Sequence, residues 1–395
     1  MQMRPGSKKF RRLAAAAFAA ACLASGSAYA DHVITLTFTG DCTIGSEELR
    51  RTQEDSLHAY AEKYGYDYFF ANFRDLFEAD DATIINLEGV FSDSANGEKT
   101  TKRYRFRGPT DFTGILKAGS VEVAGLANNH IADYGARGME STKKALEEAG
   151  IGWARAMDCH ILEKDGIRIA VFSMDYALSN TMGDQLRKKI TEMEATGEVN
   201  ASIVLFHNGN EYDPKHNSVQ ESRGKGFVEA GADLVVMHHS HVVQGMRILN
   251  NRSIFYSLGN FVFGGNREIK SVLYPRDGGR EPTSLYCLVV QAKLYFDDDG
   301  NYTGQQMILY PGYTSSAAPV NNYQPLRISA EQAEEVLDAM QYDTPDTIMS
   351  VVGEDETGYA RLVMPYLPSG MEKTENRNGD GSPEAPKAYP DRNNR

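Results

Sequence analysis

Residues 33–41 read Val-Ile-Thr-Leu-Thr-Phe-Thr-Gly-Asp, and this segment sets the pattern for the rest of the chain. Apolar and polar side chains alternate from Val33 to Phe38, and several are β-branched, which is typical of a β-strand. The segment ends in Gly40-Asp41, so a carboxylate follows the carboxyl end of the expected strand. In α/β proteins this edge of the sheet is where functional sites form.

Similar apolar, β-rich runs recur along the chain, and helix-like stretches separate them. Alternating strands and helices indicate an α/β fold that is built in layers. Further strands are expected over residues 83–86, 121–126, 167–172, 202–206, 234–237 and 253–256, and helices over residues 54–63, 138–149, 183–195 and 219–230.

The pattern changes in the C-terminal third of the chain. Residues 285–296 and 305–310 predict an antiparallel hairpin, and a helix is expected over residues 329–340. The last residues are Gly, Pro, Asn and charged side chains with almost nothing apolar, which predicts a disordered tail. The expected division is a main domain over 31–265, a β-rich part of the same domain with a helix over 266–370, and the tail over 371–395.

Residues 1–30 predict a secretory signal peptide. Five basic residues precede a short Ala-rich apolar run, and the small residues Ala28 and Ala30 fit a cleavage site. We therefore expect an exported protein that is extracellular, bound to the cell surface or periplasmic. Three alternatives remain open, namely a twin-arginine signal at Arg11-Arg12, lipidation at Cys22, and an uncleaved anchor.

The net charge and the number of cysteines limit which partners and which type of scaffold are expected. Removing residues 1–30 takes away five positive and no negative side chains, so the net charge changes from -13 to -18. A protein this acidic is not expected to bind nucleic acid or an anionic membrane. The three remaining cysteines, Cys42, Cys159 and Cys287, are too few for a disulfide scaffold.

Side chains that bind metals follow directly on several of the expected strands. Carboxylate, imidazole and amide oxygen donors together suit divalent ions such as zinc, manganese or iron. A carboxylate that lies between two such ions bridges them at about 4 Å, which is the geometry of two-metal hydrolysis. Such side chains follow the expected strands at Asp41, Glu88, Asn128-Asn129-His130, His207 and His238-His239-Ser240-His241.

Short motifs surround these donors and follow one another in a fixed order: Gly40-Asp41, Asn86-Leu87-Glu88-Gly89, Asn128-Asn129-His130, His207-Asn208-Gly209-Asn210-Glu211-Tyr212, His238-His239-Ser240-His241 and Ser257-Leu258-Gly259-Asn260. In this order they resemble the CapA family of poly-gamma-glutamate capsule biosynthesis proteins, itself similar to calcineurin-like metallophosphoesterases. The resemblance covers about residues 33–265. It implies a four-layer metallophosphoesterase-like β-sandwich flanked by helices, here with a C-terminal β-rich extension.

The resemblance also implies how the donors divide between two metal ions. Asp41 and His241 would bind one ion, Glu88 would bridge, and the second ion would be held by Asn129, His207 and His239. Calcineurin-like enzymes usually carry a histidine two residues after the first aspartate, where this chain has Thr43. We therefore expect one or two divalent ions (Mn, Zn or Fe), with the first site one ligand short. Cys42 is expected to point away from Asp41, because adjacent strand residues face opposite sides.

A catalytic role is implied for His130. In the resembling enzymes the equivalent histidine protonates the leaving group, and Asp133 is placed to orient its imidazole. The alternative for Asp133 is a helix N-cap before residues 135–149. Residues expected to support the ligands from behind are Asn128, Glu211 and Asn260.

A basic segment offers a substrate-binding surface. Arg103, Arg105 and Arg107 would lie on one face of an extended segment, where guanidinium groups suit an anionic polymer or a phosphate. The alternative is an edge strand that charge protects from aggregation.

Two functions follow. The first is a metal-dependent hydrolase of phosphoester type, with a metal-bound hydroxide as nucleophile and His130 as acid. The second is a non-catalytic component that binds or exports an anionic polymer such as poly-gamma-glutamate. In either case the resemblance implies membrane-bound capsule synthesis partners.

Overall fold

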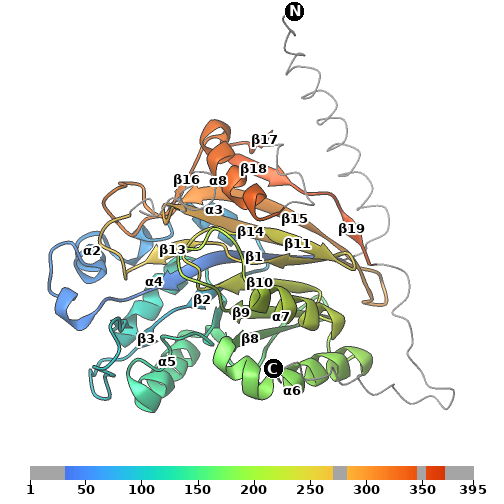
Figure 1. Cartoon of the computed structure of the whole chain (residues 1–395), viewed down its shortest axis with the longest axis horizontal. Coiled ribbons are helices and arrows are strands. Elements are labelled where there is room, and N and C mark those ends of the chain that lie inside the picture. Colours follow the sequence, from blue (N-terminus) through green and yellow to red (C-terminus); the bar gives the residue numbers. More distant parts are fainter. Residues whose placement is uncertain (1–31, 270–282, 345–352, 370–395) are drawn as a thin grey trace, which may run out of the picture.

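The computed structural model describes residues 32–269, 283–344 and 353–369 (Figure 1). The expected signal peptide at 1–30 and the expected tail at 371–395 lie outside these residues. Within the described part of the chain, no helix combines the length and apolar character that crossing a membrane requires.

The larger of two sheets contains the strand that opens the main domain, β1 (His32–Thr43). β2 (Ala82–Leu87) pairs with it in parallel and β5 (Val123–Gly125) pairs in parallel with β2, whereas β14 (Tyr286–Phe296) pairs with β1 in antiparallel register. The sheet order is β17 (Gly353–Glu354), β18 (Ala360–Val363), β15 (Tyr302–Tyr313), β14 (Tyr286–Phe296), β1, β2 (Ala82–Leu87), β5 (Val123–Gly125) and β6 (Gly152–Ala154), with β13 (Asn260–Phe263), β16 (Leu326–Arg327) and β19 (Leu367–Pro368) attached to β1 or β15.

The smaller sheet has a parallel centre and antiparallel edges. Its order is β11 (Met246–Leu249), β12 (Arg252–Phe255), β10 (Leu234–His238), β9 (Ala201–His207), β8 (Ile167–Asp175) and β7 (His160–Lys164). A separate short pair joins β3 (Val90–Phe91) to β4 (Arg107–Gly108).

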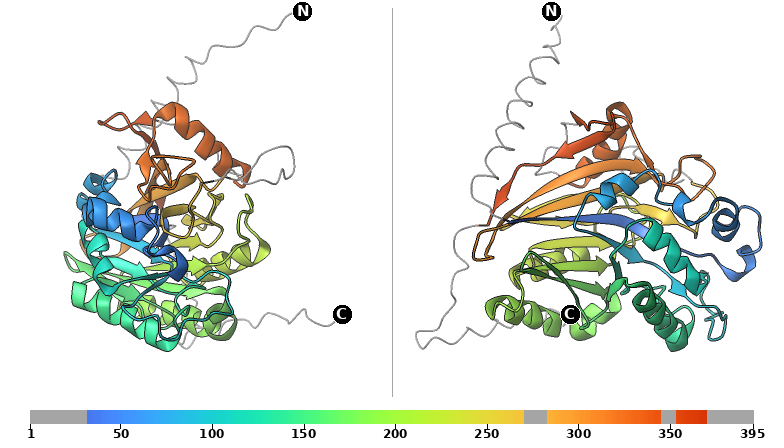
Figure 2. Two further views of the ribbon diagram at one scale, coloured as in Figure 1. Left: turned by 90° about the vertical axis from the view of Figure 1, so that its left-hand side faces the viewer. Right: turned by 180° about the vertical axis from the view of Figure 1, so that it is seen from behind.

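The two sheets pack face to face, and helices cover their outer faces (Figures 1 and 2). Side chains that alternate along β1, such as Leu36 and Phe38, meet Ile203 and Leu205 of β9 in a core between the sheets. A second core lies between the large sheet and α2 (Leu57–Tyr64), α3 (Arg74–Glu78), α4 (Thr113–Ala118) and α5 (Gly135–Ala149). A third lies between the small sheet and α6 (Tyr176–Ala195) and α7 (Ser218–Glu229).

The C-terminal hairpin extends the large sheet instead of forming a separate body. The strands β14 and β15 pair along nearly their whole length, and β14 lies directly against β1. The helix α8 (Ala330–Tyr342) packs on β14 and β15 through Ala333, Val336 and Leu337. Figure 2 shows this helix above the sheets, on the side away from α6 and α7.

The α/β class expected from the sequence is confirmed, and so are the expected strands and helices, with differences at their ends. The helix α6 begins at Tyr176, seven residues before the expected start at residue 183. Asp175 caps it by accepting a hydrogen bond from the backbone N–H of Leu178 at 2.8 Å. The intervening Ser179, Asn180 and Thr181 are weak helix formers, so their composition concealed the first turns.

Gly40 allows β1 to approach the segment before β13 closely. The carbonyl oxygen of Gly259 accepts a hydrogen bond from the backbone N–H of Asp41 at 2.8 Å. A Cβ on residue 40 would overlap this oxygen. Asp41 is therefore held by a contact that only glycine permits at position 40.

We predict that Gly40→Ala lowers the free energy of unfolding by about 1–3 kcal/mol, since the overlap with Gly259 forces a backbone shift. Urea denaturation would measure the change. Gly183→Ala is the matched control, because a Cβ there finds its nearest neighbour at 3.7 Å inside α6. This control should be neutral or stabilising by up to about 1 kcal/mol. Equal stability of the Gly40 variant and the wild type would contradict the close approach.

Candidate metal centre

Asp41 lies where the two sheets meet. It is fully buried, and each of its carboxylate oxygens accepts one hydrogen bond. Oδ1 accepts from Nδ2 of Asn86 at 2.8 Å, and Oδ2 accepts from the backbone N–H of His239 at 3.1 Å. Because Asn86 lies in β2 of the large sheet and His239 follows β10 of the small sheet, the carboxylate joins both sheets.

Glu88 lies one residue beyond β2 and has no such partners. Its backbone N–H donates to the carbonyl of Cys42 at 2.8 Å, which directs the side chain inward. The residue is fully buried, and neither carboxylate oxygen has a hydrogen-bond partner among the residues that the structure describes. The nearest imidazole nitrogens, Nε2 of His207 and of His130, lie at 3.6 and 3.9 Å from Oε1. A buried carboxylate without partners is costly, so this site is suited to a cation.

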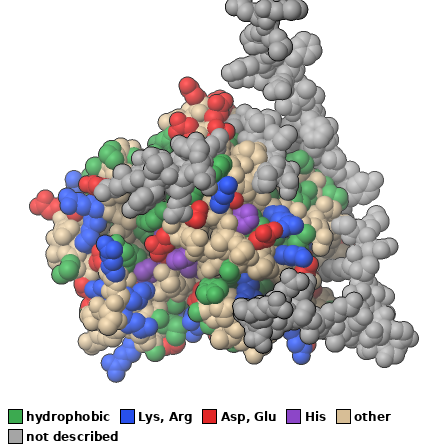
Figure 3. Space-filling view, viewed as in Figure 1, with side chains coloured by type: hydrophobic (Ala, Val, Ile, Leu, Met, Phe, Trp, Pro, Cys, Tyr) green, Lys and Arg blue, Asp and Glu red, His purple; other side chains and the backbone are tan. Residues whose placement is uncertain are grey.

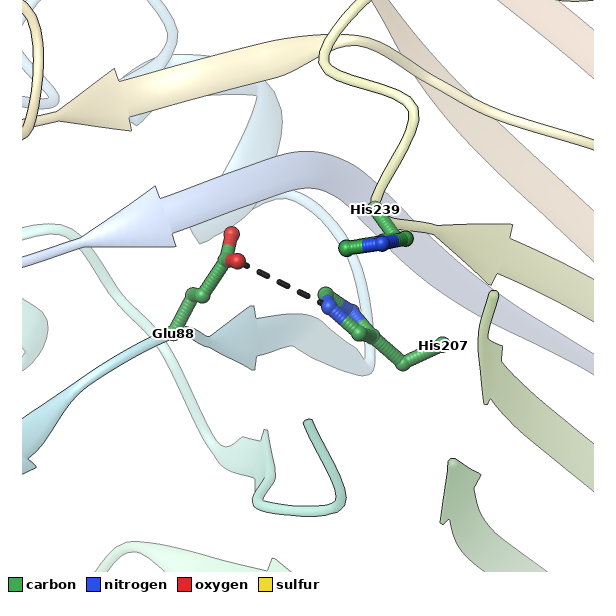
Figure 4. Close-up of side chains that lie close together, drawn as sticks. All are labelled: Glu88, His207 and His239. Atoms are coloured by element: carbon green, nitrogen blue, oxygen red, sulfur yellow. Dashed lines mark ion pairs between the residues drawn. The ribbon is translucent and has the colours of Figure 1, made fainter. Parts of the chain in front are cut away.

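Three histidines face Glu88 from the small sheet. His207 ends β9, and His239 and His241 lie on the turn after β10. Figure 4 shows Glu88, His207 and His239 converging from three different elements on one space. Histidine and acidic side chains also gather near the middle of the face seen in Figure 3.

The turn that carries two of these histidines is strained. His239 and His241 have φ values of 99° and 56°, in the left-handed region that L-residues rarely adopt. Such strain persists at functional sites when surrounding contacts over-determine it. One of these contacts fixes a ring, because Nδ1 of His241 donates to Oδ1 of Asn260 at 2.9 Å.

The residues fit divalent metal ions. Two groups place one donor atom from each member within 4.8 Å of one another: Asp41, Glu88 and His241, and Glu88, His207 and His239. Glu88 belongs to both groups. Nδ1 of His239 is buried and has no hydrogen-bond partner within the described part of the chain. Carboxylate and imidazole donors at this spacing match the preferences of zinc, manganese and iron.

The pKa shifts of Glu88, His207 and His239 also favour a cation site. Burial, followed by the nearby charge of Asp41, raises the pKa of Glu88 well above its usual value. Burial lowers the pKa of His207 well below its usual value and lowers that of His239 to about 4. The imidazoles are therefore neutral and available as ligands at neutral pH, whereas a proton on Glu88 competes with a cation.

His130 lies beside this group and is held by a carboxylate. Its Nδ1 donates to Oδ2 of Asp133 at 2.7 Å, which leaves Nε2 facing Glu88. Asp133 is fully buried and also accepts from the backbone N–H of Phe106. The N-cap of α5 is Tyr134, without a capping side chain, so the alternative of Asp133 as a helix cap is wrong.

The expected amides occupy distinct positions. Oδ1 of Asn129 accepts from Nε2 of His207 at 2.9 Å, so it lies next to the second group of donors. Asn128 is a supporting residue whose Nδ2 donates to Oδ1 of Asn86 and whose Oδ1 accepts from the backbone N–H of His130. Cys42 faces the apolar core, and burial raises the pKa of its thiol to about 12, as expected for a residue that is not a ligand.

The expected row of three free arginines does not form. Only Arg107 lies in a strand, β4, and its buried guanidinium pairs with Glu48 at 2.5 Å. Arg105 pairs with Glu98 at 2.8 Å, and Arg103 is exposed and packs over the ring of Tyr104. The prediction that the three arginines share one face required an extended strand. Residues 101–103 instead form a turn and a bend, so the side chains do not alternate as in a strand.

Two residues near the centre were not among those expected. Asn86 donates a hydrogen bond to the Asp41 carboxylate. Its position two residues before Glu88 in the Asn86-Leu87-Glu88 motif could have indicated that it lies near the donors. Nζ of Lys102 donates to the carbonyl of Asn129 at 2.7 Å and to Oδ1 of Asp133 at 2.5 Å. Lys102 precedes Arg103 in the basic segment, and nothing in the sequence indicated that it contacts Asp133 while the arginines do not.

Comparison with known proteins decides the family. The family described as "Bacterial capsule synthesis protein PGA_cap" matches residues 35–265, which include every donor of the centre. The chain belongs to the PGA_cap (CapA) family. Its resemblance to this family, expected from the ordered motifs, is confirmed.

Relatives of this CapA-family chain carry names from capsule and polymer synthesis. The capsule biosynthesis protein CapA of Bacillus anthracis is 32% identical over 287 residues, which cover 65% of this chain and 68% of the relative. The PGA biosynthesis protein CapA of Bacillus subtilis is 28% identical over 256 residues, which cover 60% and 64%. A hypothetical protein from Thermus thermophilus of known structure aligns with a TM-score of 0.40 at 13% identity, covering 70% of this chain and 99% of that one.

We predict that Glu88→Gln stabilises the metal-free protein at neutral pH by about 1–3 kcal/mol, because it removes a buried charge without partners. The folded state raises the pKa of Glu88, so the wild type loses stability as pH rises above the unfolded value near 4.3. Glutamine does not titrate. The advantage of the variant should therefore grow with pH, as measured by urea denaturation between pH 4.5 and 7.5 in chelator.

Addition of Mn²⁺ should reverse the order. An ion that binds only the folded state would raise the melting temperature of the wild type, whereas Glu88→Gln removes the carboxylate shared by the two donor groups. Thermal unfolding with and without the ion would show this. A variant that gains as much from Mn²⁺ as the wild type would argue against Glu88 as the bridging ligand.

Proposed function

We propose that this CapA-family protein is a metal-dependent hydrolase of phosphoester type that acts in the synthesis of a capsule or of poly-gamma-glutamate. The observation that carries the proposal is the unpartnered, fully buried carboxylate of Glu88, surrounded by His207, His239 and His130. The layered pair of sheets, with the donors at the carboxyl ends of parallel strands, also suits the metallophosphoesterase-like sandwich expected from the sequence. One or two divalent ions would occupy the centre.

Asp41, Glu88, Asn129, His207, His239 and His241 would hold the ions. When bound, such ions supply Lewis-acid polarisation and lower the pKa of water. The protein excludes water beneath the site, because Asp41 and Glu88 are fully buried.

His130 would transfer the proton to the leaving group. Asp133 fixes the ring through Nδ1, so Nε2 is directed at the reacting side. Burial lowers the pKa of His130, and the carboxylate of Asp133 opposes this shift. An anionic substrate beside Nε2 would favour the imidazolium further, so the acid would become charged as the substrate arrives.

Export and partners belong to the same proposal. The signal-like sequence of residues 1–30 and the relatives named for capsule synthesis support action outside the cytoplasm, next to membrane-bound capsule synthesis proteins. The substrate would be an anionic polymer or a phosphoester.

A second candidate is a non-catalytic component that binds or hands on an anionic polymer. It is favoured by the names of the two Bacillus relatives, which refer to biosynthesis and not to hydrolysis. Against it, Arg105 and Arg107 are engaged in ion pairs with Glu98 and Glu48 and are not free to grip a polymer. If the purified protein, loaded with each metal, hydrolyses no phosphoester but binds poly-gamma-glutamate, the second candidate is correct.

We predict hydrolysis of bis(p-nitrophenyl) phosphate in the presence of Mn²⁺ or Zn²⁺, and its loss in His207→Ala. His130→Ala should lower kcat by about 10²–10⁴ on a diester with a poor leaving group, because general acid catalysis is lost. The loss should be much smaller on the p-nitrophenyl ester, whose leaving group needs no proton. Absorbance of released p-nitrophenolate measures the first rate, and chromatographic quantification of the released phosphomonoester measures the second.

His32→Ala, at the opposite end of β1 from Asp41, is the control and should leave both rates unchanged. Equal losses on the two substrates in His130→Ala would exclude His130 as the acid while leaving the hydrolase proposal intact.

A further inference from the structure

The loop after β9 is attached to the turn that carries His239 and His241. The backbone N–H of Asn208 donates to the carbonyl of His238 at 3.1 Å, and that of Tyr212 donates to the carbonyl of Ser240 at 2.8 Å. These two hydrogen bonds hold both ends of residues 208–212 against the turn. The residues between them, which include Glu211, therefore have a fixed position relative to the two histidines.

The conformation of this loop is also restrained by sterics. A Cβ on Gly209, whose φ is 155°, would overlap Oγ of Ser240. Tyr212 adopts a φ of 57°, which is costly for a bulky residue and needs compensating contacts. Its ring lies 5.8 Å from the ring of His241. The strained residue immediately after Glu211 thus turns the loop over the centre.

Glu211 is brought to the two histidines by this loop. A carboxylate oxygen of Glu211 and ring nitrogens of His239 and His241 all lie within 4.8 Å of one another. Glu211 is exposed, whereas Asp41 and Glu88 are fully buried. Among the described residues, no hydrogen bond or salt bridge holds this carboxylate. It faces the donors from the solvent side and is available to a cation.

The donor count shows where a carboxylate is needed. An ion next to His207 would have four protein donors within reach, namely His207, Glu88, His239 and the amide oxygen of Asn129. Among the described residues, an ion next to Asp41 would have Glu88 and His241 in addition. Three protein donors leave a Mn²⁺ or Zn²⁺ ion short of its usual coordination unless a further ligand approaches from solvent.

We propose that Glu211 is itself a metal ligand, the carboxylate that completes the donor set of Asp41, Glu88 and His241. This inference rests on the metal centre of the proposed function. It replaces the supporting role that the sequence suggested for Glu211. With three carboxylates and two divalent ions, the centre keeps one net positive charge, which favours an anionic substrate.

The test is titration of the purified, chelator-treated full chain with Mn²⁺, followed by calorimetry and by metal content per chain. We expect Glu211→Gln to weaken one Mn²⁺ site by more than about 100-fold, because loss of a mere outer-shell partner typically costs roughly 10–100-fold. Glu221→Gln is the matched control. Glu221 is an exposed carboxylate on α7 that pairs with Arg247 at 2.6 Å and belongs to none of the donor groups. Its Mn²⁺ affinity should equal that of the wild type.

The outcomes separate the two proposals. If the wild type binds Mn²⁺ and Glu211→Gln binds it within about threefold of the wild type at every site, Glu211 is not a ligand and the hydrolase proposal stands. If the wild type binds no Mn²⁺ or Zn²⁺, both proposals fail. An unchanged far-UV circular dichroism spectrum of Glu211→Gln would show that a loss of affinity does not come from unfolding.

Discussion

Two acidic side chains in the interior govern the arrangement of this molecule. Asp41 and Glu88 are fully buried side by side at the carboxyl ends of β1 and β2. The Asp41 carboxylate accepts hydrogen bonds from both sheets, whereas the Glu88 carboxylate accepts none from the described residues. Since a buried charge of this kind is tolerated only with a compensating cation or proton, the fold carries a constraint that apolar packing does not explain.

Regular strands position some of the donors around Asp41 and Glu88, and turns and loops position the others. Parallel strands of the two sheets position Asp41 and His207, because their backbone hydrogen bonds continue to the site. Turns and loops supply the remaining donors, and these carry the strain, as in the positive φ values of His239, His241 and Tyr212. A site built in this way combines fixed distances in its buried half with ligands that approach from the solvent side.

Three positive side chains of the basic segment, Lys102, Arg105 and Arg107, pair with neighbouring carboxylates. Arg107 is buried against Glu48, and Arg105 pairs with Glu98, so the basic segment braces the region next to His130. Lys102 does the same more directly, because it links Asp133 to the carbonyl of Asn129. Positive side chains next to a cluster of carboxylates in an acidic protein thus stabilise the site before they meet any substrate.

Three features could be predicted from the residues alone: the α/β class, the strands that lead to Asp41 and His207, and the resemblance to the CapA family. These features depend on local periodicity and on the order of short motifs, both of which are readable along the chain. Three features became visible in the folded chain: the Glu88 carboxylate lacks hydrogen-bond partners among the described residues, Asp133 faces His130 instead of capping α5, and Glu211 lies close to His239 and His241. The same holds for the pairing of Arg105 and Arg107. Each of these depends on contacts between segments far apart in the chain, which residue spacing does not encode.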